Sequence, residues 1–311
     1  MSELNNPIVS VVIPTYNRAR ILPRAIKSVA RQTFEGWELL VVDDGSADET
    51  EKVVASFGDS RIHYIRHEHN RGQAAARNTG IQAARGAYVS FLDSDDEWFP
   101  EKLVKEVAAF EAGGEAVGLV YCGKELWDPE DRLLARRIPE IQGDIHHQLL
   151  GQDFIGSCSR VGLRKSVLNV IGGFDESLPL CDDWDLWLRS AKVAKAACVS
   201  EIMVRRHVGG AQMSGSLRTI FEGRRRFVEK HREEFDAAQL SHHLAVLSVI
   251  LLNYEPKRAR GMAFKSLRLR PFQPRVYASL SASLLGLHVY RWLFSRYTGW
   301  RHGLYTGRAT I

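Results

Sequence analysis

Short apolar runs alternate with amphipathic helical patterns along the first third of this 311-residue chain. A short, continuous apolar run is typical of a strand that is buried on both faces of a parallel sheet. We therefore expect strands at 8–13, 38–42, 61–65 and 87–92. Helical patterns lie between them, over 20–32, from the capping-box sequence Ser46-Ala47-Asp48-Glu49 onward, over 73–84 and from near Pro100 onward. This alternation predicts an α/β fold with a mainly parallel sheet flanked by helices.

The pattern changes near residue 216. Before that point we expect strands at 119–122 and 157–163 and a short helix at 183–192. After it the pattern is helical, over 216–236, 239–254, 256–269 and 275–296. The sequence therefore predicts a first domain over residues 1–215 and a C-terminal helical extension over residues 216–311.

Charge is unevenly distributed along the chain. The net charge is +5, but no acidic residue follows Glu255, whereas 11 Lys and Arg residues do. A basic end of this kind suits an anionic membrane surface, and residues 287–297 mix aromatic side chains with arginines as interfacial helices do. The alternative is the solvated basic face of a helical cap on the first domain. Nucleic-acid binding is a poor fit, because no recognised module accompanies the charge.

The sequence predicts a cytoplasmic protein, peripheral on the inner face of the plasma membrane if its basic end binds lipid. The polar first residues lead directly into an apolar strand, without a signal-peptide pattern. The four cysteines have neither zinc-site nor redox spacing and suit a reducing compartment. Residues 276–294 form the most apolar stretch, but His288 and Arg291 make it a poor transmembrane candidate.

Polar residues follow three of the expected strands. They are Pro14-Thr15-Tyr16-Asn17-Arg18, Asp43-Asp44-Gly45-Ser46 and Asp93-Ser94-Asp95-Asp96. Ligands of open parallel sheets bind beyond the carboxyl ends of the strands, so these loops predict the site. The first loop is not the Gly-rich turn of a dinucleotide-binding dehydrogenase, and no P-loop lysine motif is present.

The acidic residues at this edge predict a divalent cation. Crowded carboxylates raise each other's pKa values, and a cation relieves the repulsion. Mg²⁺ and Mn²⁺ prefer oxygen ligands and often combine one or two carboxylates with substrate phosphates. Asp93 and Asp95 are two residues apart, so both can face one ion. The alternative for such a pair alone is a solvated acidic turn.

Six motifs follow one another over about residues 7–215. They resemble, in type and order, the motifs of the large family-2 group of inverting glycosyltransferases, whose GT-A fold is a Rossmann-like α/β fold. The six are Val11-Val12-Ile13-Pro14-Thr15-Tyr16-Asn17-Arg18, Val41-Val42-Asp43-Asp44-Gly45-Ser46, Gly72-Gln73-Ala74-Ala75-Ala76-Arg77-Asn78-Thr79-Gly80, Phe91-Leu92-Asp93-Ser94-Asp95-Asp96, Gly172-Gly173-Phe174-Asp175-Glu176 and Asp182-Asp183-Trp184-Asp185-Leu186-Trp187-Leu188-Arg189.

The resemblance implies a donor site for a UDP- or GDP-type nucleotide-diphosphate sugar, mainly in residues 1–112. Asp44 would accept a hydrogen bond from the base, and Gly72 would let the backbone approach the nucleoside. Asp93 would contact the ribose or the metal, and Asp95 would hold the Mn²⁺ or Mg²⁺. The other residues expected to face the donor are Pro14, Thr15, Tyr16 and Asn17 at the nucleobase, Arg77 and Asn78 on the helix that follows Gly72, and His207 at the metal or diphosphate.

The resemblance also implies an acceptor and catalytic part within residues 113–215. Asp183 matches the catalytic base of the family, and Asp182 and Trp184 would contact the acceptor. The family usually has Glu before the base, where this chain has Asp182, so that contact is the one in doubt. The tryptophans have a plainer explanation in helix packing, because Asp183 and Trp187 lie on one helix face.

The function that these features predict is transfer of a sugar, with inversion, to a glycan or lipid-linked acceptor by metal-assisted single displacement. The setting that the resemblance implies is bacterial polysaccharide or lipopolysaccharide assembly. A sugar-1-phosphate nucleotidyltransferase is the alternative enzyme, but it normally opens with a Gly-rich loop that carries Arg or Lys. A non-catalytic sugar-binding relative is the other alternative, and the presence of Asp44, Asp93, Asp95 and Asp183 argues against it.

Overall fold

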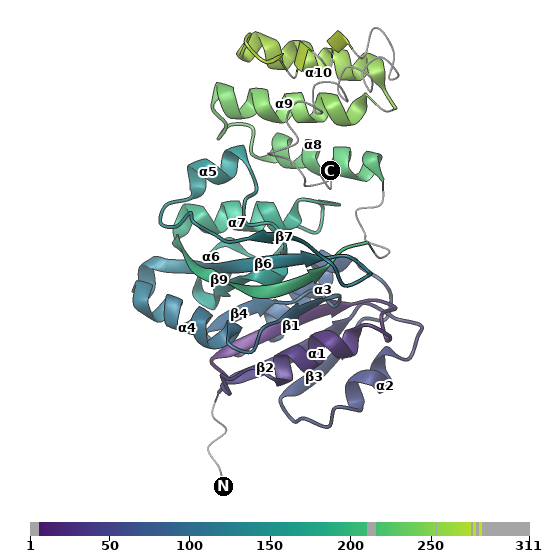
Figure 1. The fold of residues 1–311 in the computed structure, drawn as a ribbon, viewed down its shortest axis with the longest axis vertical. Coiled ribbons are helices and arrows are strands. Elements are labelled where there is room, and N and C mark those ends of the chain that lie inside the picture. Colours follow the sequence, from purple (N-terminus) through teal and green to yellow (C-terminus); the bar gives the residue numbers. More distant parts are fainter. Residues whose placement is uncertain (1–5, 210–215, 253, 275, 278–279, 282–311) are drawn as a thin grey trace. The chain divides into compact units, whose positions relative to one another are not determined.

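The structure, a computed structural model, describes residues 6–209, 216–252, 254–274, 276–277 and 280–281 (Figure 1). The chain forms two compact units. The first contains Met1–Leu149, Asp153–Ser177 and Asp182–Gly210, and the second contains Leu150–Gln152, Leu178–Cys181 and Ala211–Ile311. The aromatic and basic segment 287–297 and most of the predicted helix 275–296 lie outside the described residues.

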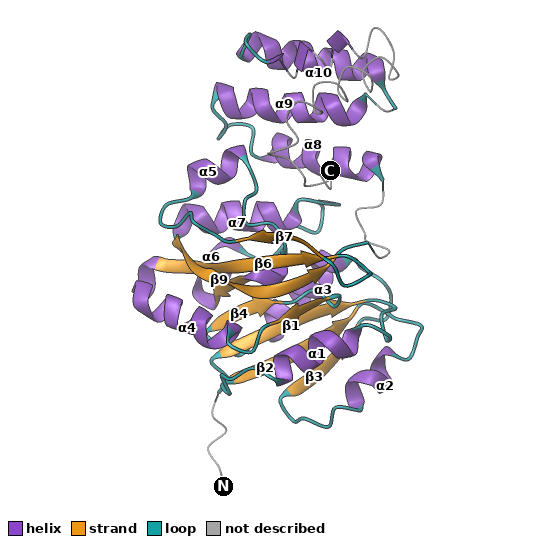
Figure 2. Cartoon of the chain, in the orientation of Figure 1, coloured by secondary structure: helices purple, strands orange, loops and turns teal. Residues whose placement is uncertain are grey.

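The first unit is built on one nine-stranded sheet (Figure 2). The strand order is β3-β2-β1-β4-β8-β6-β9-β5, with β7 paired to β6. β3, β2, β1 and β4 are parallel, β8 is antiparallel to β4 and β6, and β9 is parallel to β6. The strands are β1 (Val9–Thr15), β2 (Trp37–Asp43), β3 (Ile62–Arg66), β4 (Tyr88–Phe91), β5 (Asp96–Trp98), β6 (Val117–Trp127), β7 (Leu133–Arg137), β8 (Val161–Arg164) and β9 (Lys195–His207).

Helices cover both faces of this sheet, as the alternating pattern predicted. α1 (Leu22–Ala30), α2 (Thr50–Ala55) and α4 (Lys102–Gly113) share one apolar cluster with the β1 side chains of Val9, Val11 and Ile13. α3 (Gln73–Ala83) packs on the opposite face, where Gly80 lies against Val12. α7 (Asp182–Val193) lies on that second face, because Trp187 contacts Phe174, which contacts Phe91 of β4. The mainly parallel α/β fold is confirmed.

The helix expected from near Pro100 is α4, which begins at Lys102. Two local predictions are wrong. Ser46 does not begin a helix, because its hydroxyl accepts the N–H of Asn17 at 2.8 Å and α2 begins only at Thr50. The expected strand 157–163 begins instead with a 3-10 turn, Cys158–Arg160, before β8. The sequence patterns also missed β5, β7, β9, α5 (His146–Gly151) and α6 (Lys165–Ile171).

The second unit is helical. It contains α8 (Leu217–Lys230), α9 (Ala237–Leu251) and α10 (Pro256–Leu269), as the sequence predicted. A capping box joins Asp236 and Gln239 at the start of α9. Farther along α9, burial and the charge of Arg224 lower the pKa of His243 to about 3. The neutral ring can then donate from Nε2 to the carbonyl of Leu150 at 2.8 Å. Within the part of the chain that the structure describes, no helix is both long and apolar enough to cross a bilayer.

Candidate active site

The carboxyl ends of β1 and β2 bring two predicted donor loops together. Pro14 and Thr15 end β1 beside Val42 and Asp43 of β2. The two loops hold each other, because the Asn17 N–H donates to Ser46 Oγ and the Asn17 Oδ1 accepts the N–H of Ala47, both at 2.8 Å. Asn17 takes a positive φ of 52° at this turn. Next to it, Tyr16 is 45% exposed.

Asp44 lies buried beneath the loop that leads into α3. Its Oδ1 accepts hydrogen bonds from His67 Nδ1 at 2.7 Å and from the backbone N–H of Arg71 at 2.9 Å. Its Oδ2 accepts the backbone N–H of Gly72 at 2.8 Å. Gly72 has a φ of 97° with open space around it, so backbone conformation rather than packing favours glycine there. Asp44 thus holds the start of α3. A nucleobase N–H would share a carboxylate that already has three donors.

α3 places Arg77 between the acidic run and α7. Arg77 is buried, and its guanidinium donates to Asp93 Oδ1 at 2.7 Å and to Asp182 Oδ2 at 3.3 Å. The neighbouring Asn78 has a different role, because its amide forms hydrogen bonds with both the N–H and the carbonyl of Phe174 at 2.7 and 2.9 Å. The structure therefore brings Arg77 to the predicted site, while Asn78 holds the loop that contains Phe174.

The carboxyl groups of Asp93, Asp95 and Asp96 have three different environments. Burial would raise the pKa of Asp93, but the charge and hydrogen bond of Arg77 hold it below the ordinary value. Burial and the charge of Asp93 raise the pKa of Asp96 to about 8. The Asp95 side chain is 28% exposed, and its Oδ2 pairs with Arg18 at 2.6 Å. Asp95 is therefore the most accessible of the three carboxylates.

The end of β9 lies beside this run because β5 pairs with it. Asp96, Glu97 and Trp98 are opposite Arg206, Arg205 and Val204. The positive charge of Arg206 favours the ionised forms of Asp93 and Asp96. Arg205 is directed elsewhere, to an ion pair with Glu125 at 3.2 Å. The predicted site residue His207 has its Nε2 2.7 Å from Glu97 Oε1.

Asp182 and Asp183 begin α7 on the other side of Arg77. Burial, together with the charges of Asp153 and Asp182, raises the pKa of Asp183 to about 8. Burial also raises the pKa of Asp182, against the opposing charge of Arg77. The Oδ1 of Asp183 accepts the N–H of Trp184 at 2.7 Å. A carboxyl group with a pKa near neutrality is suited to general-base catalysis.

The two tryptophans of α7 are buried. Trp184 is 4% exposed and Trp187 is fully buried against Phe174. Their indole N–H groups donate to backbone carbonyls, Trp184 to Leu149 at 2.8 Å and Trp187 to Gly156 at 3.2 Å. Little of the Trp184 ring is left for the predicted contact with an acceptor.

Two charged residues that lie beside Gly156 were missed by the sequence analysis. Asp153 lies in the irregular segment after α5, and its charge acts on Asp183. Lys124 lies near the end of β6, with its ammonium next to Gly156. Neither belongs to a motif, and no sequence signal distinguishes them from surface charges. Ser159 was also missed, although its hydroxyl links the N–H of Asp93 at 3.1 Å to Asp96 Oδ2 at 2.6 Å.

The predicted metal requires accessible oxygen ligands at the acidic run. Mg²⁺ and Mn²⁺ sites in nucleotide-binding enzymes use one or two carboxylates together with substrate phosphates and water. The partly exposed Asp95 fits that requirement. Among the described residues, no three His, Cys, Asp or Glu side chains are grouped so as to hold an ion by themselves.

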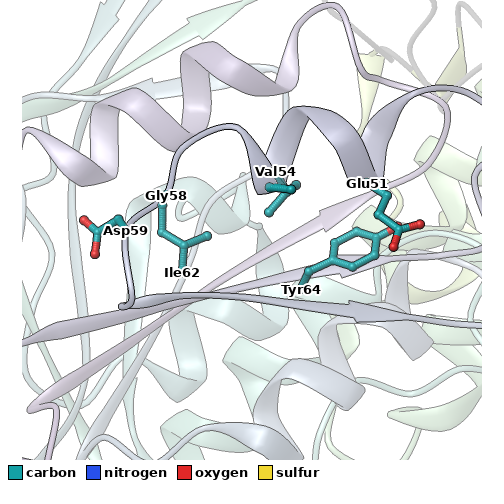
Figure 3. Close-up of a pocket in the computed structure, with 7 residues that line it drawn as sticks. Glu51, Val54, Gly58, Asp59, Ile62 and Tyr64 are labelled. Atoms are coloured by element: carbon teal, nitrogen blue, oxygen red, sulfur yellow. The ribbon is translucent and has the colours of Figure 1, made fainter.

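A cavity of about 280 Å³ lies between α2 and β3, at the edge of the sheet (Figure 3). Its lining includes none of the acidic run and none of α7. The lining residues are Glu51, Val54, Ala55, Gly58, Asp59, Ile62 and Tyr64. This cavity is therefore separate from the candidate active site.

Solved structures with a similar fold include nucleotide-sugar complexes. S. aureus TarS 1-349 in complex with UDP-GlcNAc has a TM-score of 0.62 at 20% identity, over 89% of this chain and 79% of that one. The mannosyltransferase PcManGT from Pyrobaculum calidifontis, in complex with GDP-Man and Mn²⁺, has a TM-score of 0.57 at 19% identity, over 90% and 86%. The expected GT-A fold is confirmed by these similarities.

Sequence comparison leads to the same group of proteins. An uncharacterized glycosyltransferase of Rickettsia prowazekii is 33% identical over 219 residues, which cover 69% of this chain and 68% of the relative. The UDP-Glc:alpha-D-GlcNAc-diphosphoundecaprenol beta-1,3-glucosyltransferase WfgD of Escherichia coli is 33% identical over 191 residues, or 61% and 72%. The family model described as glycosyl transferase family 2 matches residues 10–172. Since that match spans more than half of the sequence, the chain belongs to glycosyl transferase family 2.

Proposed function

We propose that this glycosyltransferase is a hexosyltransferase that inverts the anomeric carbon in a single displacement. The observation that carries the proposal is Asp183, a partly exposed carboxyl at the start of α7 whose pKa is raised to about 8. In its ionised form Asp183 removes the proton from an acceptor hydroxyl as the oxygen attacks the sugar. A positioned base of this kind contributes about 10²–10⁴-fold in rate.

The donor part of the proposal uses the loops after β1, β2 and β4. Tyr16 and Asn17 face the nucleobase with Asp44 and Gly72, and Asp93 accepts from the ribose while Arg77 holds it in place. Arg206, on the acidic-run side of β9, faces the diphosphate. Asp95 would hold Mn²⁺ or Mg²⁺, with Asp93 and His207 as the other predicted ligands. A bound cation supplies charge neutralisation for the departing nucleoside diphosphate.

The domain division follows from the same assignment. Residues 1–112 bind the donor, residues 113–215 carry the base and the acceptor contacts, including Asp182 and Trp184, and residues 216–311 form the basic extension. The relatives support the substrate classes. TarS and PcManGT were solved with UDP-GlcNAc and with GDP-Man and Mn²⁺, and the name of WfgD gives a lipid-linked acceptor. We therefore favour a UDP- or GDP-sugar donor and a glycan or lipid-linked acceptor in bacterial polysaccharide or lipopolysaccharide assembly.

The test is a screen of UDP-glucose, UDP-GlcNAc and GDP-mannose with Mn²⁺, in which the released product is identified. A glycosyltransferase releases the nucleoside diphosphate, whereas a nucleotidyltransferase releases pyrophosphate and a sugar-binding relative releases neither. We expect Asp183→Asn to lower the transfer rate by about 10²–10⁴-fold with unchanged calorimetric affinity for the nucleoside diphosphate. Asp59→Asn, at the cavity of Figure 3, is the matched control. Transfer that survives in Asp183→Asn would exclude Asp183 as the base.

We also propose that the protein is cytoplasmic and binds the inner face of the plasma membrane through α10. Phe264 on α10 is 58% exposed, and Phe272 after it is 95% exposed. Arg260 and Arg268 lie one helical turn to either side of Phe264, so apolar and cationic groups share a face. Such a combination is typical of helices that lie in an anionic membrane surface.

A further inference from the structure

Two hydrogen bonds fix α7 to the chain on both sides of Asp153. The indole of Trp184 donates to the carbonyl of Leu149, and the indole of Trp187 donates to the carbonyl of Gly156. Both tryptophans are buried, so these hydrogen bonds are shielded from water. Because Asp183 stands at the start of the same helix, the position of Asp153 is set relative to the base.

Asp153 acts on Asp183 by its charge. Its Oδ1 accepts the N–H of Gly156 at 2.8 Å. After burial, the negative charge of Asp153 is the largest influence that raises the pKa of Asp183. The two carboxyl groups are therefore within electrostatic range of each other, although they come from separate elements.

Lys124 of β6 lies beside the same glycine that binds Asp153. The register of β6 against β9 shifts on both sides of Gly123, because β9 has extra residues there, with Val199, Ile202 and Val204 opposite Cys122, Gly123 and Lys124. A side chain at Gly123 would lie 2.6 Å from the carbonyl of Glu201, so β9 passes close to β6 just before Lys124. The Lys124 ammonium lies against Gly156, where a Cβ would be only 3.3 Å from Nζ.

Asp153 and Lys124 act on each other by charge without forming an ion pair in the described structure. Burial, together with the charges of Arg160 and Arg206, lowers the pKa of Lys124 to about 8. Lys124 and Asp153 flank Gly156 but do not contact each other. Lys124 therefore retains a hydrogen-bond donor for a ligand, and Asp153 retains an acceptor. A sugar hydroxyl both donates and accepts, and it carries no charge to be repelled by either group.

We propose that Lys124 and Asp153 bind an uncharged sugar ring of the acceptor, through hydroxyls next to the one that faces Asp183. This proposal rests on the glycosyltransferase function proposed above. It assigns two specificity-determining residues to the acceptor side and makes the acceptor a neutral glycan end rather than a phosphate or a uronic acid. An anionic acceptor group would be repelled by the Asp153 carboxylate, which lies beside Lys124.

The test uses the full chain with whichever donor it consumes and compares probe acceptors. The uncharged probes are the p-nitrophenyl glycosides of glucose, galactose, mannose and N-acetylglucosamine, and the anionic probe is p-nitrophenyl glucuronide. We expect Lys124→Met and Asp153→Asn each to raise KM for an accepted uncharged glycoside by about 10-fold or more, the scale of a hydrogen bond to a charged group. The Kd for the nucleoside diphosphate should be unchanged, which separates this role from loss of structure.

Matched controls make the same substitutions at the opposite edge of the sheet. Lys52→Met and Asp59→Asn lie in α2 and in the lining of the Figure 3 cavity, and both should leave KM unchanged. Lys124→Arg keeps the charge and should recover most of the acceptor affinity. Unchanged KM values in both site variants would overturn the proposal. So would a parallel loss of nucleoside diphosphate binding, use of the glucuronide alone, or rejection of every uncharged glycoside while the donor is still consumed. Failure to release nucleoside diphosphate from any donor would instead count against the glycosyltransferase proposal.

Discussion

At the residue scale, the acidic run shows how differently neighbouring carboxylates behave. The partly exposed Asp93 is kept ionised by Arg77, and the buried Asp96 has a pKa raised to about 8 by burial and by the charge of Asp93. Only Asp95, with 28% of its side chain exposed, can offer an oxygen to an arriving ligand without losing a buried contact. A sequence pattern such as Asp-x-Asp cannot separate these states, because they depend on Arg77 and Ser159 from distant elements.

The pH dependence of transfer should report the environment of Asp183. The base acts in its ionised form, and its pKa in the folded protein is raised to about 8 by burial, Asp153 and Asp182. We therefore expect kcat/KM to rise with pH and to level off only above about pH 8, the range set by that pKa. The measurement is an initial-rate profile at saturating Mn²⁺. An acid limb near pH 4, the ordinary value for Asp, would show that Asp183 is not the group that titrates.

Substitution of Asp95 should remove the metal dependence of donor binding. In the wild-type protein we expect Mn²⁺ to strengthen binding of the nucleoside diphosphate by about 10-fold or more, as a cation between carboxylate and phosphate does. In Asp95→Ala, calorimetry with Mn²⁺ and with EDTA should give the same weak affinity. Asp131→Ala, in the turn after β6, is the control and should keep the response. Equal Mn²⁺ responses in the wild-type protein and in Asp95→Ala would contradict the assignment.

At the element scale, α3 depends on a glycine to approach β1. A Cβ at Gly80 would lie 2.3 Å from Val12 Cγ1, inside the buried core of the sheet. We expect Gly80→Ala to lower the free energy of unfolding by about 1–3 kcal/mol, the usual cost of overpacking. Urea denaturation measures this change. Gly261→Ala, at an open position inside α10, should be neutral or stabilising by up to about 1 kcal/mol. Equal effects at the two sites would mean that the close packing of α3 on β1 does not determine the change in the free energy of unfolding.

The elements also show what the sequence could and could not predict. β1 to β4 and α3 were predicted to within a few residues, because each is a continuous apolar run or a clear helical pattern. β5 has only the three residues Asp96–Trp98 and forms through pairing with β9, more than a hundred residues later. The capping box at Ser46 failed for the same kind of reason, since the hydroxyl is taken by Asn17 of another loop.

The same limit applies to the candidate site. Motif residues such as Arg77, Asp93 and Asp183 could be predicted, because each lies in a stretch with recognisable neighbours. Asp153 and Lys124 could not, since their positions follow from two indole hydrogen bonds and from the irregular pairing of β9 with β6 beside Gly123. Contacts between elements of this kind have no local sequence pattern.

At the scale of the whole molecule, the two units differ in what they expose. The first unit carries the acidic run and Asp183, whereas α10 of the second presents Phe264 among Lys and Arg residues, with Phe272 beyond it. A lipid-linked acceptor would stay at the membrane, so a chain that docks there works beside its substrate. In the proposed docking, the basic residues would provide attraction to an anionic surface, at about 1 kcal/mol each, and the exposed rings would provide apolar burial.

Vesicle flotation tests this division of roles. The full chain should float with vesicles that contain phosphatidylglycerol and should remain behind with purely zwitterionic vesicles or at high salt, because salt screens exposed charges. Phe264→Ser combined with Phe272→Ser should weaken binding by about 10-fold or more, since burial of one Phe side chain stabilises by roughly 1.5–3 kcal/mol. Leu133→Ser with Leu134→Ser removes two exposed apolar side chains from β7 and serves as the control. If the intact chain does not float with anionic vesicles, or if both double variants float equally well, α10 is not a membrane-binding surface and its basic residues are simply solvated.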